Sequence, residues 1–138
     1  MELKVHLVFA GTCESAFNFY QEIFKGEIIF LFRKKEDPTQ ELDETEKEKI
    51  SHIILKTEQF ELSGEDAEKN SDITINSTKL ILVFRDMNEL KRVFNALAVN
   101  GQLVTPLHKE FFTECSGELI DQYGIRWLIM MTDENYED

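Results

Sequence analysis

The sequence predicts an α+β fold built from two tandem βαβββ modules. An internal repeat is the first observation: residues 4–27 align without a gap with residues 79–102, and seven of the 24 aligned positions are identical. Average composition gives about one or two identities by chance. The second observation is that each copy reads as strand, tight turn, helix and glycine, in that order. One unit of this size leaves an apolar sheet face exposed, so a second copy is expected to complete the core.

Each copy places a helix after its first strand. In the first copy Thr12 is expected to cap the helix, which ends at Lys25-Gly26. In the second copy Asp86 and Glu89 form a capping-box pattern, and Asn100-Gly101 ends the helix. Apolar residues at helical spacing form a stripe on both helices, at Ala16, Phe17, Tyr20, Ile23 and Phe24 and at Leu90, Val93, Phe94, Leu97 and Ala98.

Segments with strand character follow each helix. They are residues 27–34, 49–56 and 60–63 in the first half, and 102–105, 110–115 and 124–131 in the second. The chain is therefore expected to be one domain, 1–138, with module one at 1–65, a linker at 66–77 and module two at 78–133. Residues 33–49 are dense in charge and are expected to form a mobile, solvated loop, with a lid or a short exposed helix as alternatives.

Composition argues against several classes of partner. The chain has 27 acidic and 15 basic residues, and its formal charge of -12 repels nucleic acid and anionic lipid. No apolar run approaches the roughly 20 residues that span a bilayer. The beginning of the chain lacks the pattern of a signal peptide, and Cys13 and Cys115 match neither a disulfide framework nor a zinc motif. We therefore expect a cytoplasmic protein that binds neither nucleic acid nor membrane.

Several segments resemble the PhnB-like branch of the vicinal oxygen chelate superfamily, which is often labelled demethylubiquinone-methyltransferase-like. The resemblance implies a glyoxalase/bleomycin resistance-like fold, in which the tandem βαβββ modules form a curled mixed sheet with a cleft. It also implies a homodimer. A Phe-Trp-Gly that is frequent in the branch stands here as Phe111-Phe112-Thr113. The sequence has no glycine-rich strand-to-helix turn that cradles a nucleotide cofactor, so neither methyl transfer nor a cofactor is expected. The matching segments are residues 13–28, 49–56, 104–112 and 116–130, with Gly117, Asp121, Gly124 and Trp127 in the last.

The superfamily places metal ligands on the first and last strands of each module, and strand alternation indicates which residues face the cleft. His6 and Val8 share one face of the first strand, and Ile81 is the repeat equivalent of His6. His6 is either a hydrogen-bonded strand histidine or a polar anchor and proton carrier for a ligand. Its equivalent in the second module has no metal-binding side chain.

The last strands supply the other two positions. If Trp127 packs inward like Phe60, these positions fall on Glu61 and Leu128. Catalytic zinc and iron sites generally take three protein ligands, and of the four positions only His6 and Glu61 carry donors, so no metal site is expected. A metal enzyme remains the alternative if His52 faces the cleft and supplies a third ligand.

Further residues are assigned to the cleft or away from it. Phe111 and Phe112 are expected on opposite faces of one strand, so that one of them lines the cleft. Arg126 is expected either to meet an anionic group there or to be a solvated rim residue. Cys13, at the start of the first helix, is expected to be structural because no base is apparent beside it. The predicted cleft residues are His6, Val8, His52, Glu61, Phe112, Arg126 and Leu128.

The sequence therefore predicts a protein that binds a small, partly apolar molecule in a metal-free cleft. The alternative is a metal-dependent lyase, transferase or dioxygenase of the superfamily type. A third interpretation is a structural or partner-binding protein whose own side chains fill the cleft.

Overall fold

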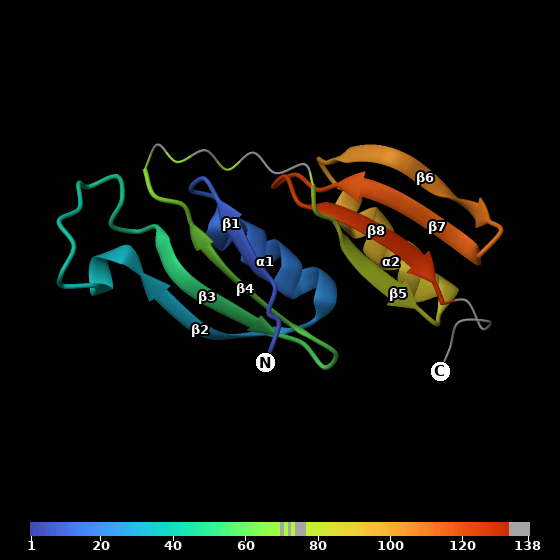
Figure 1. Cartoon of the computed structure of the whole chain (residues 1–138), viewed down its shortest axis with the longest axis horizontal. Helices are drawn as coiled ribbons and strands as arrows, with labels where there is room; N and C mark the ends of the chain where they lie inside the picture. Colours follow the sequence, from blue (N-terminus) through green and yellow to red (C-terminus); the bar gives the residue numbers. More distant parts are fainter. Residues whose placement is uncertain (70, 72, 74–76, 133–138) are drawn as a thin grey trace. The chain divides into compact units, whose positions relative to one another are not determined.

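The computed structural model describes residues 1–69, 71, 73 and 77–132. The chain divides into two compact units, residues 1–74 and residues 75–138. Each unit contains one helix and one four-stranded sheet (Figure 1).

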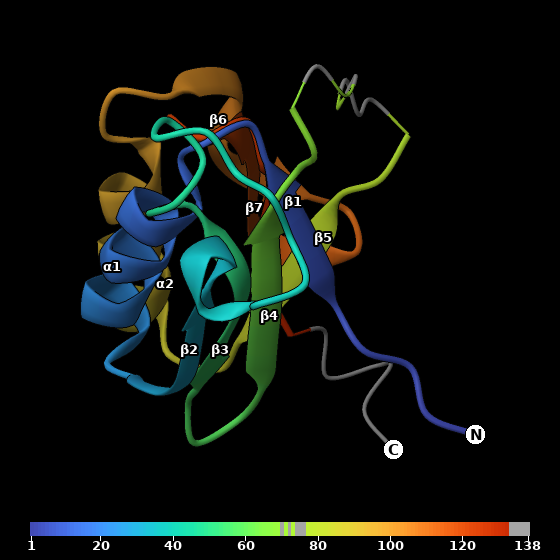
Figure 2. The same cartoon turned by 90° about the vertical axis from the view of Figure 1, so that its left-hand side faces the viewer.

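The first unit has the element order predicted from the repeat. Its sheet has the strand order β1-β4-β3-β2, in which β1 is parallel to β4 and the other neighbours are antiparallel. Figure 2 shows α1 beside this sheet, with β4 between β1 and β3. The elements are β1 (His6–Phe9), α1 (Cys13–Phe24), β2 (Glu27–Arg33), a 3-10 turn (Lys34–Glu36), β3 (Ile50–Lys56) and β4 (Glu61–Asp66).

The second unit repeats this topology. Its sheet has the order β5-β8-β7-β6, with β5 parallel to β8 and antiparallel pairs elsewhere. The predicted tandem βαβββ arrangement of an α+β protein is therefore confirmed. The elements are β5 (Leu80–Phe84), α2 (Met87–Ala98), β6 (Gln102–Glu110), β7 (Thr113–Ile120) and β8 (Arg126–Met131).

In each unit the apolar stripe of the helix packs on one face of the sheet. Alternate strand residues such as Leu7 and Phe9 in β1, or Trp127 and Ile129 in β8, are buried beneath it. The opposite face of each sheet is not covered by the unit's own helix. The helix residues that are buried are Cys13, Ala16, Phe17, Tyr20 and Ile23 in α1 and Leu90, Val93, Phe94 and Leu97 in α2.

The two helices begin differently. Asp86 caps α2 as predicted, since its side chain accepts a hydrogen bond from the Asn88 N–H. The prediction that Thr12 caps α1 was wrong, because its side chain makes no capping hydrogen bond. Asp66, at the end of β4, binds that turn instead: its Oδ1 accepts from the N–H groups of Gly11 and Cys13, both at 3.0 Å.

Each helix is followed by a left-handed residue and a glycine, directly after α1 and one residue later after α2. Lys25 and Asn100 adopt left-handed conformations, with φ of 55° and 57°, and a glycine follows each. A Cβ on Gly26 would lie 2.7 Å from a backbone oxygen, and one on Gly101 would lie 2.5 Å from another. Both glycines are required by close approach of the helix end to a strand, which explains their repetition.

Several strand bounds differ from the prediction, most clearly those of β6 and β7. β6 continues through Pro106 to Glu110, and its register with β7 shifts on either side of that proline, as expected for a residue without an N–H. The predicted strand 110–115 was wrong, because Phe111 and Phe112 form the turn between β6 and β7. Phe111 is 97% exposed.

Asp121 organises the turn between β7 and β8. Asp121 is buried, and its Oδ1 accepts hydrogen bonds from the N–H groups of Tyr123 and Ile125. Its Oδ2 accepts from Trp127 Nε1 at 2.9 Å. Gly124 in this turn has φ of 90°, a conformation that favours glycine. These three hydrogen bonds identify Asp121 as a structural residue of the turn.

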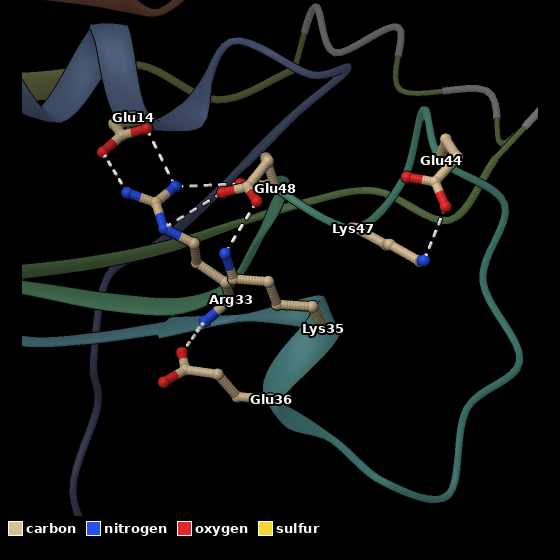
Figure 3. A network of polar contacts seen from close by, with 7 residues as sticks. All are labelled: Glu14, Arg33, Lys35, Glu36, Glu44, Lys47 and Glu48. Carbon is tan, nitrogen blue, oxygen red and sulfur yellow. Dashed lines mark hydrogen bonds and ion pairs between the residues drawn. The ribbon is translucent and has the colours of Figure 1, made fainter.

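Residues 34–49 are more ordered than the charge pattern suggested. Arg33, at the end of β2, forms a two-point contact with Glu14 of α1 at 3.0 and 2.7 Å, and it also contacts Glu48 (Figure 3). Lys34 and Glu46 are buried, at 7% and 5% exposure. The segment is therefore anchored to the first unit by paired charges, although most of its residues are exposed as expected for a solvated loop.

Candidate functional site

The open face of the first sheet carries the polar residues of interest. In β1, His6 and Val8 alternate with the buried Leu7 and Phe9, so they lie on the face opposite α1. The parallel register pairs His6 with Ser63 and Val8 with Glu65. Four side chains from two adjacent strands are thereby brought together on one surface.

Both ring nitrogens of His6 are engaged. Nδ1 lies 2.7 Å from Ser63 Oγ, and Nε2 lies 3.0 Å from Glu65 Oε1. The Ser63 hydroxyl donates its only proton to the Val5 carbonyl oxygen at 3.2 Å, so Ser63 Oγ accepts from Nδ1–H of His6. Nε2 then faces a carboxylate, and this contact is a hydrogen bond only when a proton lies between the two groups. The imidazole of His6 is thereby held between the side chains of Ser63 and Glu65 on the neighbouring strand.

A second imidazole lies against the first. His52 of β3 stacks on His6, with ring centroids 5.3 Å apart and an interplanar angle of 23°. Phe30 of β2 meets His52 edge-on at a centroid distance of 5.8 Å. Side chains from β1, β3 and β2 thus form an aromatic row across the open face, above the small Ser63 of β4.

A pocket of about 540 Å³ opens beside this row. It is lined by residues 2–6, by His52 and Ile54 of β3, and by residues 60–63. We call it the first-sheet pocket. Its walls combine the apolar side chains of Leu3, Ile54 and Phe60 with the imidazoles and with Glu61, a composition typical of small-molecule sites.

Three predicted cleft residues, His6, His52 and Glu61, line the first-sheet pocket. Val8 lies on the same face of β1 as His6 but is not part of the lining. Phe112 lies in the β6–β7 turn and not on a strand. The prediction that strand alternation directs its side chain into the cleft was therefore wrong.

Arg126 and Leu128 share the open face of the second sheet, where Leu128 pairs with Ile81. Arg126 Nε is 3.2 Å from Glu118 Oε2, and Lys79 Nζ is 2.7 Å from Glu118 Oε1. The Glu118 side chain is only 12% exposed. Arg126 thus already has a carboxylate partner within its own unit.

Glu61 was expected to be the equivalent of Leu128, but the residue at that position in the first unit is Ser63, two residues further along β4. The strand register pairs Leu128 with Ile81, whereas it pairs Ser63, not Glu61, with His6. Phe60 does pack on the helix side, with its ring 5.3 Å from that of Phe24. The paired positions are therefore His6 and Ser63 in the first unit and Ile81 and Leu128 in the second.

This donor set does not fit a three-ligand metal. No group of three His, Cys, Asp or Glu side chains able to hold a metal ion occurs among the residues that the structure describes. Both nitrogens of His6 already contact protein oxygens, and a metal would have to displace one of them. Its repeat equivalent, Ile81, has no donor atom.

The thiol of Cys13 is unsuited to nucleophilic chemistry. Its side chain is fully buried at the start of α1. Burial raises the pKa of the Cys13 thiol well above its usual range, and the charges of Asp66, Glu65 and Glu14 raise it further. The group is therefore a buried, protonated thiol at neutral pH, in agreement with the structural role expected for it.

The predictions from sequence did not include Ser63, Glu65 and Phe30 as partners of the two histidines. Alternation along residues 61–65 would have placed Ser63 and Glu65 on the face of Glu61. Alternation does not give the parallel register of β1 and β4, which decides which residues of β4 lie beside His6. These strands are separated by more than 50 residues in the chain and are not joined by a turn.

Comparison with known proteins places these features in a wider group. The sequence profile described as 3-demethylubiquinone-9 3-methyltransferase matches residues 1–130. Protein YjdN of Escherichia coli (strain K12) is 25% identical over 138 residues, covering 94% of each chain. A structure of a PhnB protein from Bacillus cereus is 25% identical, with a TM-score of 0.82 and coverage of 96% of this chain and 100% of that one.

A more distant structure shares the fold. It is a glyoxylase/bleomycin resistance protein/dioxygenase domain from Frankia sp. EAN1pec, which is 14% identical with a TM-score of 0.66 over 96% of this chain and 97% of that one. The predicted glyoxalase/bleomycin resistance-like architecture is thereby confirmed. Within the described residues, no helix has the length and apolar character needed to cross a bilayer.

Proposed function

The chain belongs to the 3-demethylubiquinone-9 3-methyltransferase family, in its PhnB-like branch, and on that premise we propose that it binds a small, partly apolar molecule in the first-sheet pocket. The observation that carries this proposal is the pocket of about 540 Å³ bounded by two stacked imidazoles and an apolar wall. A cavity of this size accommodates a ligand of metabolite size, and a few polar groups at its edge fix the ligand's orientation.

Methyl transfer is less well supported by the local structure than binding is. Helix N-termini and glycine-rich turns bind cofactor phosphates and carboxylates through free backbone N–H groups. At α1 the N–H groups of Gly11 and Cys13 are already bound by Asp66, and at α2 the Asn88 N–H is bound by Asp86. The start of α1 therefore has two fewer free N–H groups for an anion, and the start of α2 has one fewer.

A metal-dependent lyase, transferase or dioxygenase is the second candidate, because the family shares its fold with such proteins. It requires donors beyond those that meet at His6. Elemental analysis of protein purified without chelator, together with the His6→Ala variant, separates the two candidates. Stoichiometric zinc, iron, manganese or nickel that is lost in the variant would favour the metal enzyme over our proposal.

Thermal-shift screening of a metabolite library tests the binding function directly. A compound that binds only the folded state stabilises it by about 2.7 kcal/mol at 100 times its Kd, which a melting curve detects readily. Binding in the first-sheet pocket predicts that His52→Ala removes the shift, since this ring lines the pocket. Ile81→Ala is the matched control, because Ile81 is the repeat equivalent of His6 on the other sheet and is 55% exposed.

Loss of the thermal shift in Ile81→Ala but not in His52→Ala would indicate that the ligand binds on the second sheet. Absence of any stabilising compound, with the folded state intact, would favour the third interpretation, in which the protein has a structural or partner-binding role.

We further propose that the protein is a cytoplasmic homodimer. Exposed apolar side chains on the second unit, including Ile81, Val83, Leu103 and Val104, support an assembly that covers them. Two buried free cysteines are compatible with a reducing compartment. Light scattering coupled to gel filtration tests the dimer, and a monomeric mass at micromolar concentration would contradict it.

A further inference from the structure

The geometry points to an organic cation as the ligand of the first-sheet pocket: a small molecule with an ammonium group on a flat apolar body. This inference rests on the proposed binding function and adds the chemical class of the ligand. Two properties of the pocket lead to it, namely the nature of its walls and the balance of charges around it.

The walls fit a flat apolar body. Leu3, Ile54 and Phe60 provide apolar surface, and the His52 ring adds an aromatic face. His52 is itself held in place by the ring of His6 on one side and the edge of Phe30 on another. A flat ligand therefore meets preformed surface and does not have to order these side chains on binding.

The charges favour a cation. Glu65 contacts Nε2 of His6 at 3.0 Å and does not line the pocket. Glu61 lines the pocket from β4, and its carboxylate forms no hydrogen bond or ion pair with any residue that the structure describes. An ammonium group that binds there gains a charge-assisted hydrogen bond without breaking an existing one.

One cation and a second carboxylate also line the pocket. Lys4 and Glu2 lie in the segment that precedes β1 and are both exposed. Their charges cancel, which leaves Glu61 as the excess charge of the lining. The formal charge of -12 over the whole chain acts in the same direction, because it repels anionic ligands and attracts cationic ones.

The test compares three probes of nearly equal size, benzylamine, benzyl alcohol and benzoate, by titration calorimetry at low salt. We expect benzylamine to bind about two- to fivefold more tightly than benzyl alcohol, the range expected for one partly exposed ion pair. Glu61→Gln should abolish this preference and leave binding of the alcohol unchanged. Glu114→Gln, which removes an exposed carboxylate from β7 in the other unit, is the matched control and should preserve the preference.

Each other outcome has a defined meaning. Equal binding of the amine and the alcohol, or a preference for benzoate that Lys4→Gln removes, would overturn the cation assignment while the binding function stands. If none of the three binds but library compounds do so through His52, the cation assignment fails and the binding function again stands. If nothing binds in either experiment, the binding function itself fails.

Discussion

Replacing Asp66 by alanine should destabilise the first unit more than any other single change to a carboxylate in it. Asp66 is 2% exposed, and its two carboxylate oxygens accept three hydrogen bonds from backbone N–H groups. The donors are Gly11 and Cys13 at the start of α1, both at 3.0 Å, and Ile50 at the start of β3, at 2.8 Å. One side chain thus holds the ends of β4, α1 and β3 together.

The expected loss follows from these three donors. A buried N–H left without an acceptor costs about 1–3 kcal/mol. Cys13 and Ile50 are buried, whereas Gly11 is exposed and water can replace the lost acceptor there. Two buried donors therefore give a decrease of about 2–6 kcal/mol in the free energy of unfolding for Asp66→Ala. Asp66→Asn retains one acceptor oxygen and should lose less.

The matched control is Asp86→Ala, which removes the corresponding helix cap in the second unit. Asp86 makes one capping hydrogen bond, to the Asn88 N–H, and the loss of such a cap costs about 1 kcal/mol. Urea unfolding followed by circular dichroism gives the total loss for each variant. Native-state hydrogen exchange at Gly11, Cys13 and Ile50 localises it to the first unit.

If Asp66→Ala loses no more stability than Asp86→Ala, then the three hydrogen bonds do not hold these elements together. The same conclusion follows if the loss is large but exchange at Ile50 and Cys13 is unchanged.

Three further predictions concern other parts of the chain. A double-mutant cycle on Glu14→Gln and Arg33→Gln should give a coupling of about 0.5–1 kcal/mol, modest because the pair is partly exposed. Because the hydrogen bond from Arg33 lowers the pKa of Glu14 in the folded state, the coupling should be present above the unfolded-state pKa and lost as the pH falls through the folded-state value; a coupling that persists in acid would contradict the pairing. Cys13 should react with a thiol reagent at pH 8 only as fast as the protein unfolds, since the thiol is buried and its pKa is raised; rapid labelling of the native protein would refute this. Gly101→Ala should cost about 1–3 kcal/mol, because the added methyl meets a backbone oxygen at 2.5 Å, whereas Gly124→Ala meets no atom within 4 Å and tests backbone strain alone; equal melting temperatures for the two would exclude the steric explanation.

The fold was predictable because its main signals are local or are repeated. Helical spacing of apolar residues gave both helices, and the shared Gly26 and Gly101 marked the same close approach in each unit. The gap-free alignment of residues 4–27 with 79–102 predicted the duplication itself. Errors arose where a contact joins distant residues. Thr12 is a good local cap, yet Asp66, 53 residues further along the chain from Cys13, binds the helix start instead.

The candidate site was less predictable than the fold for the same reason. Alternation identified the open face of β1 and the presence of His6 on it, but the partners of His6 depend on a parallel pairing that no turn determines. A shift of two residues along β4 separates Glu61, the expected partner, from Ser63, the observed one. Such a shift keeps every side chain on its face, so neither burial nor hydrophobic pattern distinguishes the two registers in the sequence.

The two units differ in the polarity of the open face at the position of His6. Leu7 and Phe9, which α1 covers, recur as Leu82 and Phe84 under α2, because both helices need an apolar sheet beneath them. On the open face, by contrast, His6 has become Ile81, and its pairing partner Ser63 corresponds to Leu128. Val8, the next residue on the open face of β1, recurs as Val83, so this exchange is local to His6 and its pairing partner. The polar pair therefore lies on the first sheet, which is the sheet on which we propose that the ligand binds.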